Sequence, residues 1–140
     1  MLKLADLVVG KSLMELNKPV TQDNINLYAE ASGDFNPIHL DPEFGKKMQL
    51  GGTIAHGMMI LAYISELMGV NFGNSWLSTG KLNVRFKEAA RPGDVISVSG
   101  RITNVERETD RFSIYSSVIC QNQNNQIIIT GDTEVRLKTL

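Results

Sequence analysis

A carboxylate, an amide and an imidazole lie within six consecutive positions: Asp34, Asn36 and His39. A carboxylate and an imidazole can each accept a proton from water and return it to a substrate. In a helix Asp34 and His39 would point about 140° apart around the axis, too far to share one small substrate atom. Gly33 permits unusual backbone angles, and Pro37 lacks an N–H and restricts the residue before it. The spacing therefore predicts a bent loop that aims both side chains inward.

A second feature is the pair His56-Gly57, which is followed by an almost continuous apolar run from Met58 to Met68. Apolar residues on nearly every face predict a helix buried on most sides. A membrane span is the alternative, but Glu66, His56, several glycines and the lack of cationic flanks disfavour it. A helix starting at this point would have its unpaired N–H groups near Gly57.

The remaining sequence predicts the elements that position these residues. A first strand is expected from about Lys11 to Val20, a helix capped by Thr21 that stops at Gly33, and a short helix from Pro42 to about Met48. Four later segments alternate apolar and polar residues, as half-buried antiparallel strands do. The apolar residues of the first two segments are Leu82, Val84 and Phe86, and then Ile96, Val98 and Ile102. Those of the last two are Phe112, Ile114 and Val118, and then Ile127, Ile129, Val135 and Leu137. One sheet with one apolar face needs a cover, and only the 58–68 helix is apolar enough. The expected fold is α+β, a curved antiparallel sheet around one long helix, which is the hot-dog arrangement, in a single domain over residues 1–140.

Composition and charge are those of an ordinary soluble globular domain. The 140 residues are 42% hydrophobic and 21% charged with a net charge of −1, so no nucleic-acid-binding surface is indicated. The single cysteine, Cys120, cannot form an intrachain disulfide, which favours a cytoplasmic protein. No signal peptide is recognised in residues 1–10.

Two segments of the chain carry a resemblance to a known family. Tyr28-Ala29-Glu30-Ala31-Ser32-Gly33-Asp34-Phe35-Asn36-Pro37-Ile38-His39 and Ala55-His56-Gly57-Met58 resemble the MaoC-like dehydratases, which include (R)-specific enoyl-CoA hydratases and hydroxyacyl-ACP dehydratases. The order of elements extends the resemblance over nearly the whole chain. It implies a lyase of fatty acid metabolism that reversibly hydrates a 2-enoyl thioester to the (R)-3-hydroxyacyl thioester.

The resemblance also implies roles for individual residues. Asp34 and His39 would be the catalytic pair, Asn36 would help to hold the water, the Gly57 N–H would bind the thioester oxygen, and Ser65 would line the site. A helix N-terminus suits the negative charge that develops on that oxygen. Coenzyme A or acyl carrier protein would carry the substrate, and no metal or organic cofactor is required.

Several alternatives remain open at this stage. Arg85 and Lys87 are expected either to face solvent or to contact coenzyme A phosphates. Asp34 and Asn36 could simply cap a turn, and His56 is expected to orient the helix start. Glu66 would be the carboxylate of a rival hot-dog thioesterase, and a non-catalytic acyl-binding subunit is a third hypothesis. A zinc site from His39, Asp41, His56 and Cys120 matches no common spacing. A homodimer is expected, and no membrane partner.

Overall fold

The computed structural model describes residues 1–138, and one five-stranded sheet dominates them. The strands are β1 (Leu16–Pro19), β2 (Lys81–Phe86), β3 (Val95–Arg107), β4 (Arg111–Gln121) and β5 (Ile127–Lys138). They are ordered β1-β3-β4-β5-β2, and every neighbouring pair is antiparallel. This sheet confirms the predicted fold class.

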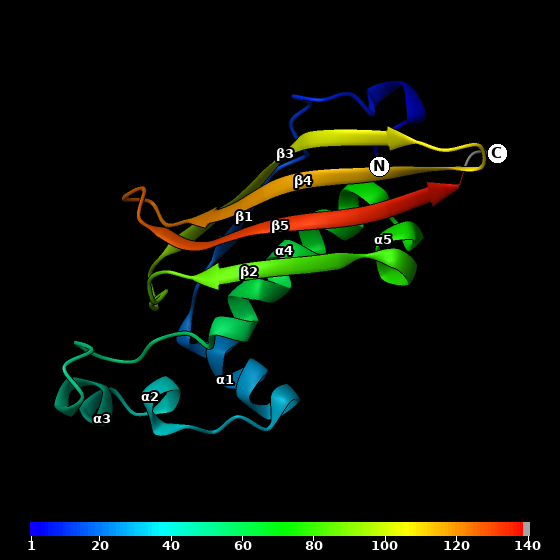
Figure 1. The fold of residues 1–140 in the computed structure, drawn as a ribbon. Coiled ribbons are helices and arrows are strands. Elements are labelled where there is room, and N and C mark those ends of the chain that lie inside the picture. Colours follow the sequence, from blue (N-terminus) through cyan, green and yellow to red (C-terminus); the bar gives the residue numbers. More distant parts are fainter. Residues whose placement is uncertain (139–140) are drawn as a thin grey trace.

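Helices occupy one face and one end of that sheet. They are the 3-10 helix η1 (Leu4–Asp6) and the α-helices α1 (Gln22–Ser32), α2 (Pro37–Leu40), α3 (Pro42–Lys47), α4 (Gly57–Phe72) and α5 (Asn74–Thr79). Figure 1 shows α4 lying against one face of the curved sheet, with α1, α2 and α3 grouped near its first turn and α5 near its last. Helix α2, which carries His39, thus lies near the first turn of α4, which begins at Gly57 (Figure 1).

The core is the layer between α4 and the inner face of the sheet. Period-two alternation places one set of strand side chains on that face, where they are fully or almost fully buried; they include Ile96, Val98, Ile102, Ile114, Ile129 and Val135. From α4 they meet Ile60, Ile64, Leu67 and Met68, all at most 1% exposed. Burial of this apolar area is the main force that fixes α4 on the sheet.

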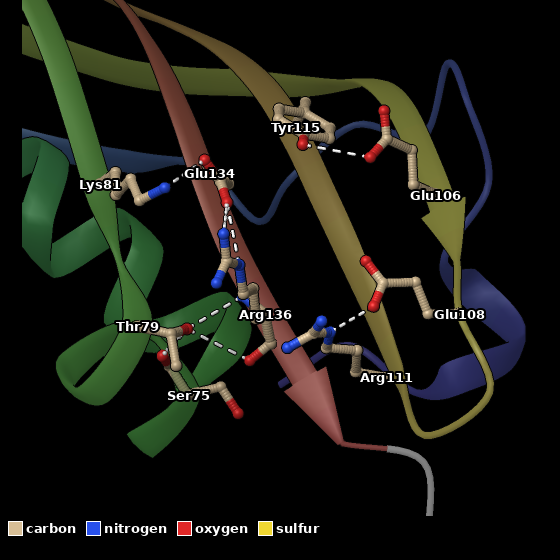
Figure 2. A network of polar contacts seen from close by, with 9 residues as sticks. All are labelled: Ser75, Thr79, Lys81, Glu106, Glu108, Arg111, Tyr115, Glu134 and Arg136. Atoms are coloured by element: carbon tan, nitrogen blue, oxygen red, sulfur yellow. Dashed lines mark hydrogen bonds and ion pairs between the residues drawn. The ribbon is translucent and has the colours of Figure 1, made fainter.

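The outer face of the sheet is polar, as the alternation predicts. Figure 2 shows Glu134 accepting hydrogen bonds from Lys81 and Arg136, while the Tyr115 hydroxyl donates to Glu106. The contacts from Lys81 and Arg136 lower the pKa of the Glu134 carboxyl group. Such a face needs no second layer of structure.

Helix α4 extends one turn beyond the predicted run, and it is less enclosed than predicted. Met58, Ala62 and Glu66, each four residues apart, form an exposed stripe along it, which we call the α4 stripe. Met58 alone is 57% exposed. None of the helices within residues 1–138 has the length and apolarity that crossing a membrane requires.

The first strand is shorter than predicted. Residues before Leu16 form an isolated bridge from Ser12 to Arg101, and Gly10 and Leu13 donate main-chain hydrogen bonds to β3, but they form no continuous strand. Next to the strand, the side chain of buried Asn71 accepts from the Met14 N–H at 2.9 Å and donates to the Met14 carbonyl at 3.2 Å. The main chain of Met14 therefore pairs with α4, and the prediction of a strand from Lys11 was wrong.

Candidate active site

The loop that carries Asp34 begins where α1 ends. Gly33 stops the helix with a φ of 77°, a left-handed conformation that favours glycine. Two local hydrogen bonds then shape the turn: Ser32 Oγ accepts from the Asp34 N–H at 3.2 Å, and Asp34 Oδ1 accepts from the Asn36 N–H at 3.1 Å. One carboxylate oxygen therefore serves the turn, and the Asp34 side chain stays 53% exposed.

His39 lies on the single-turn helix α2, whereas the sequence analysis predicted a loop throughout. Asn36 caps α2 through its side-chain oxygen, which accepts from the Ile38 N–H, and Pro37 is its first residue. Proline fits that position because the first N–H of a helix has no partner within the helix. The helix starts after Asp34, so the two side chains can still converge.

The His39 ring is held from several sides. The ring Nδ1 lies 2.8 Å from the Ile54 carbonyl oxygen. The main-chain carbonyl of His39 accepts a hydrogen bond from Gln22 Nε2 at 2.8 Å. Because a carbonyl oxygen only accepts, Nδ1 carries the hydrogen, and in the neutral ring Nε2 presents a lone pair. That Nε2 lies 3.8 Å from Asp34 Oδ2. The two predicted catalytic groups are thus brought together.

His56 contacts both members of this pair. It is 2% exposed, and its Nε2 is 2.9 Å from the Asp34 carbonyl oxygen. Its ring stacks on that of His39 with centroids 3.8 Å apart and planes 26° apart. The ring of Tyr28 approaches from another side, with a centroid distance of 4.8 Å.

Gly57 is the first residue of α4, as predicted, and it follows His56 immediately. Its N–H has no carbonyl within the helix to bond, so it can donate to a ligand. A Cβ atom added to Gly57 would lie 3.0 Å from Cε1 of Phe86 and 3.2 Å from its Cδ1. A half-exposed aromatic ring on β2 therefore borders the helix start.

Comparison with known proteins identifies the family. The model of the MaoC-like domain matches residues 7–122. The chain belongs to this family. It is 27% identical to 3-hydroxybutyryl-CoA dehydratase of Methylorubrum extorquens over 94% of this chain and 82% of that protein. It is 26% identical to the (R)-specific enoyl-CoA hydratase of Aeromonas caviae over 87% of this chain and 90% of that one.

The fold agrees with solved structures. The (R)-hydratase from A. caviae, described as involved in PHA biosynthesis, superposes with a TM-score of 0.82 and 27% identity over 94% of this chain and 97% of that chain. A MaoC-like dehydratase from Rhodospirillum rubrum gives the same TM-score at 22% identity, covering 100% of this chain and 99% of that chain. The predicted family and hot-dog fold are both confirmed.

Two predicted residues of the MaoC-like chain lie farther along α4. Ser65 follows Gly57 by about 12 Å of helix, at 1.5 Å per residue, and its Oγ accepts from Trp76 Nε1 at 2.9 Å. Glu66, the candidate carboxylate of the thioesterase hypothesis, lies on the α4 stripe, where Lys18 Nζ approaches to 2.8 Å. The hydroxyl and the carboxylate thus have partners away from Asp34, and a substrate contact of Ser65 stays a prediction.

Arg85 and Lys87 take different positions. Arg85 alternates with Phe86 along β2, so it projects from the face opposite to α4. There it lines a hollow of about 570 Å³ on the outer face, together with Glu15, Arg101 and Asp132 among others. Lys87 follows the end of β2, where its N–H donates to the Ile128 carbonyl. Contacts of either side chain with phosphates remain a prediction.

The residues of the zinc alternative are not gathered as a set. Within residues 1–138, the potential metal ligands that converge are Asp34, His39 and His56, with ligand atoms within 4.8 Å of one another. Asp41 instead caps α3. Cys120 lies in the core, where burial raises the pKa of its thiol to about 12 and disfavours the thiolate that metals bind.

Sequence reasoning missed three contributors to the site: the Ile54 carbonyl, Gln22 and Phe86. The first acts through its backbone, for which the sequence has no signal. Gln22 was placed correctly on α1, but nothing in its type indicates the bond to His39. Phe86 was placed on the inner face of its strand, and only the register of β2 against β5 brings it to Gly57.

Proposed function

We propose that this protein reversibly hydrates a 2-enoyl thioester to the (R)-3-hydroxyacyl thioester, as a hydro-lyase. The observation that carries the proposal is the 3.8 Å separation of Asp34 Oδ2 and His39 Nε2 beside the start of α4. Relatives named as an (R)-specific enoyl-CoA hydratase and a 3-hydroxybutyryl-CoA dehydratase support the same reaction.

The separation of the two groups suits one shared water molecule. At 3.8 Å, Oδ2 and Nε2 are too far apart for a direct hydrogen bond. A water between them can lie within hydrogen-bond distance of both. Because Nε2 presents a lone pair and the carboxylate only accepts, each can take a proton from that water.

The reaction then proceeds by addition across the double bond. The water oxygen bonds to C3 while the C2=C3 π electrons move toward the thioester carbonyl, whose oxygen gains negative charge. The Asp34/His39 pair takes one proton from the water and delivers one to C2, which restores the carbonyl. Addition of water involves no net oxidation or reduction, and we propose that no metal or organic cofactor takes part.

The start of α4 would stabilise the intermediate charge. The N–H of Gly57 and the positive end of the helix dipole both favour an oxyanion at this point. Gly57 has no side chain in the way, so the thioester oxygen can approach closely. A single donor of this type typically lowers a barrier by about 3–4 kcal/mol.

We further propose that the protein is a homodimer. Met58 and Ala62 of the α4 stripe and the side chains of Phe35 and Phe86, 59% and 53% exposed, leave apolar surface outside the core. Strand β2 is an edge strand with one neighbour, and such edges invite pairing. Pairing of two copies would cover this surface and enclose an acyl chain.

Sedimentation equilibrium at micromolar concentration tests the dimer. The expected result is twice the chain mass, and Met58→Asp on the α4 stripe should shift the population toward monomer. Leu77→Asp is the matched control, because Leu77 is 78% exposed on α5. A wild-type protein that remains monomeric would contradict the proposal.

A direct assay tests the reaction itself. Purified protein with a short-chain 2-enoyl-CoA should remove the ultraviolet absorbance of the enoyl thioester, and chiral chromatography should identify the (R)-3-hydroxyacyl product. Chelating agents should leave the rate unchanged. Release of free thiol without hydration would select the thioesterase, and no activity unless a partner chain is added would select the acyl-binding subunit. A parallel series on acyl carrier protein distinguishes the two carriers.

A further inference from the structure

His56 is a buried titratable side chain that the proposed reaction does not use. It touches both catalytic residues, through the 2.9 Å contact of Nε2 with the Asp34 carbonyl and through the ring stack on His39. It is also the residue immediately before α4. One side chain thus connects the Asp34 loop, the His39 ring and the helix start.

The contact with Asp34 fixes which nitrogen of His56 carries hydrogen. A carbonyl oxygen only accepts, so Nε2 is the donor, and in the neutral ring Nδ1 holds a lone pair. Nδ1 is fully buried, and it has no hydrogen-bond partner among residues 1–138. The opposite assignment would leave Nε2 unprotonated against a carbonyl oxygen. His39 has the reverse arrangement, with hydrogen on Nδ1 facing Ile54.

We propose that His56 is a positioning residue, which holds the Asp34 main chain and the His39 ring at the separation that a shared water requires. The inference rests on the proposed function and deepens it. Asp34 needs an external anchor, because its side chain is half exposed and its turn follows the left-handed Gly33. The hydrogen bond from His39 Nδ1 to the Ile54 carbonyl fixes one edge of the ring but leaves it able to tilt about that bond. The stacked His56 ring opposes this tilt.

Three substitutions separate the two contacts. His56→Gln keeps an N–H donor for the Asp34 carbonyl but removes the ring. His56→Phe keeps a ring under His39 but removes the donor, and His56→Leu removes both. A displacement of about 1 Å in a catalytic group can cost about 10²-fold in rate. We therefore expect His56→Leu to lower kcat by about 10–100-fold, with KM changed less than about threefold. His56→Gln and His56→Phe should each lower kcat less than His56→Leu does.

A second readout does not depend on activity. The chain has two histidines, so nitrogen NMR of the untagged protein resolves His39 and His56 by comparison with His56→Gln. At about pH 8.5, where free imidazole is neutral, His56 should show hydrogen on Nε2 and His39 hydrogen on Nδ1. In His56→Leu the His39 signal should move toward the average of the two neutral tautomers.

The outcomes are distinct from those that test the proposed function. If wild-type His56 carries its hydrogen on Nδ1, the positioning role is overturned whether or not the protein hydrates enoyl thioesters. If all three variants keep wild-type kcat, it is overturned as well. If circular dichroism shows that His56→Leu does not fold, kcat of His56→Gln and His56→Phe and the nitrogen NMR spectrum of the wild type still test the positioning role.

Discussion

Replacing Asp34 by asparagine is expected to lower kcat for hydration by about 10²–10⁴-fold, the usual contribution of one acid–base group. The amide keeps the shape of the side chain, and its oxygen can still accept from the Asn36 N–H as Oδ1 does. It cannot take a proton from water. The turn should therefore survive, and the loss should appear in kcat.

His39→Asn is expected to give a loss of the same order. Its amide N–H can replace Nδ1 as the donor to the Ile54 carbonyl, while nothing replaces the lone pair of Nε2. If both residues act on one water, the Asp34→Asn/His39→Asn double variant should be little worse than either single variant, because groups that work as a unit are not additive.

Asp41→Asn provides the matched control. This carboxylate also lies close to His39 in sequence, but it caps α3 through contacts with the Glu43 and Phe44 N–H groups. Asparagine caps helices about as well as aspartate, so stability and rate should both stay near wild type. Wild-type rates in the Asp34 and His39 variants would show that these groups do not perform the reaction.

Local signals made much of the fold predictable. Thr21 caps α1 by accepting from the Asn24 N–H, Gly33 ends that helix, and Asp41 with Pro42 starts α3, as the sequence indicates. These signals act between residues that are close in sequence, so they do not depend on how the rest of the chain folds. The same holds for the period-two strands, whose alternation depends only on backbone geometry.

Predictions failed where a distant contact outweighs the local pattern. Ile127 was expected on the inner face with Ile129, but it is 38% exposed, while Ile128 is buried. A register shift between Cys120 and Gln121 pairs Gln121 with Ile127, which breaks the alternation at that end of β5. A bulge of this kind depends on two strands and has no signal in either one alone.

In the candidate site, too, the features that depend on local sequence were predicted and those that depend on distant contacts were not. The approach of Asp34 to His39 and the position of Gly57 at the start of α4 were predicted correctly, because their types suit the chemistry and the family resemblance pointed to them. Their catalytic roles stay predictions. The ring stack of His56 on His39 was not predictable, since it depends on how the segment before α4 folds back on α2. The Ile54 main chain makes that connection twice, since its N–H donates to the Ile38 carbonyl and its carbonyl accepts from His39.

The second large effect is expected at Gly57. Gly57→Ala keeps the N–H but should hinder its use, and kcat/KM should fall by up to about 10²–10³-fold, the loss that is typical when an oxyanion donor no longer acts. The added methyl group would lie 3.0 Å from the Phe86 ring, so either the ring or the helix start must shift. In the proposed mechanism, the same methyl group would also hinder the approach of the thioester oxygen to the N–H. Steady-state kinetics on an enoyl-CoA measures the loss.

Two further variants separate these causes. Gly69→Ala makes the same substitution later in α4, where nothing lies within 4 Å of the new Cβ, and it should leave the rate unchanged while favouring the helix. Gly57→Ala/Phe86→Ala removes the ring that the methyl group meets. If blocked approach to the N–H is the cause, the double variant stays slow. Recovery of the wild-type rate would assign the loss to packing against Phe86 and would overturn blocked approach to the N–H as its cause.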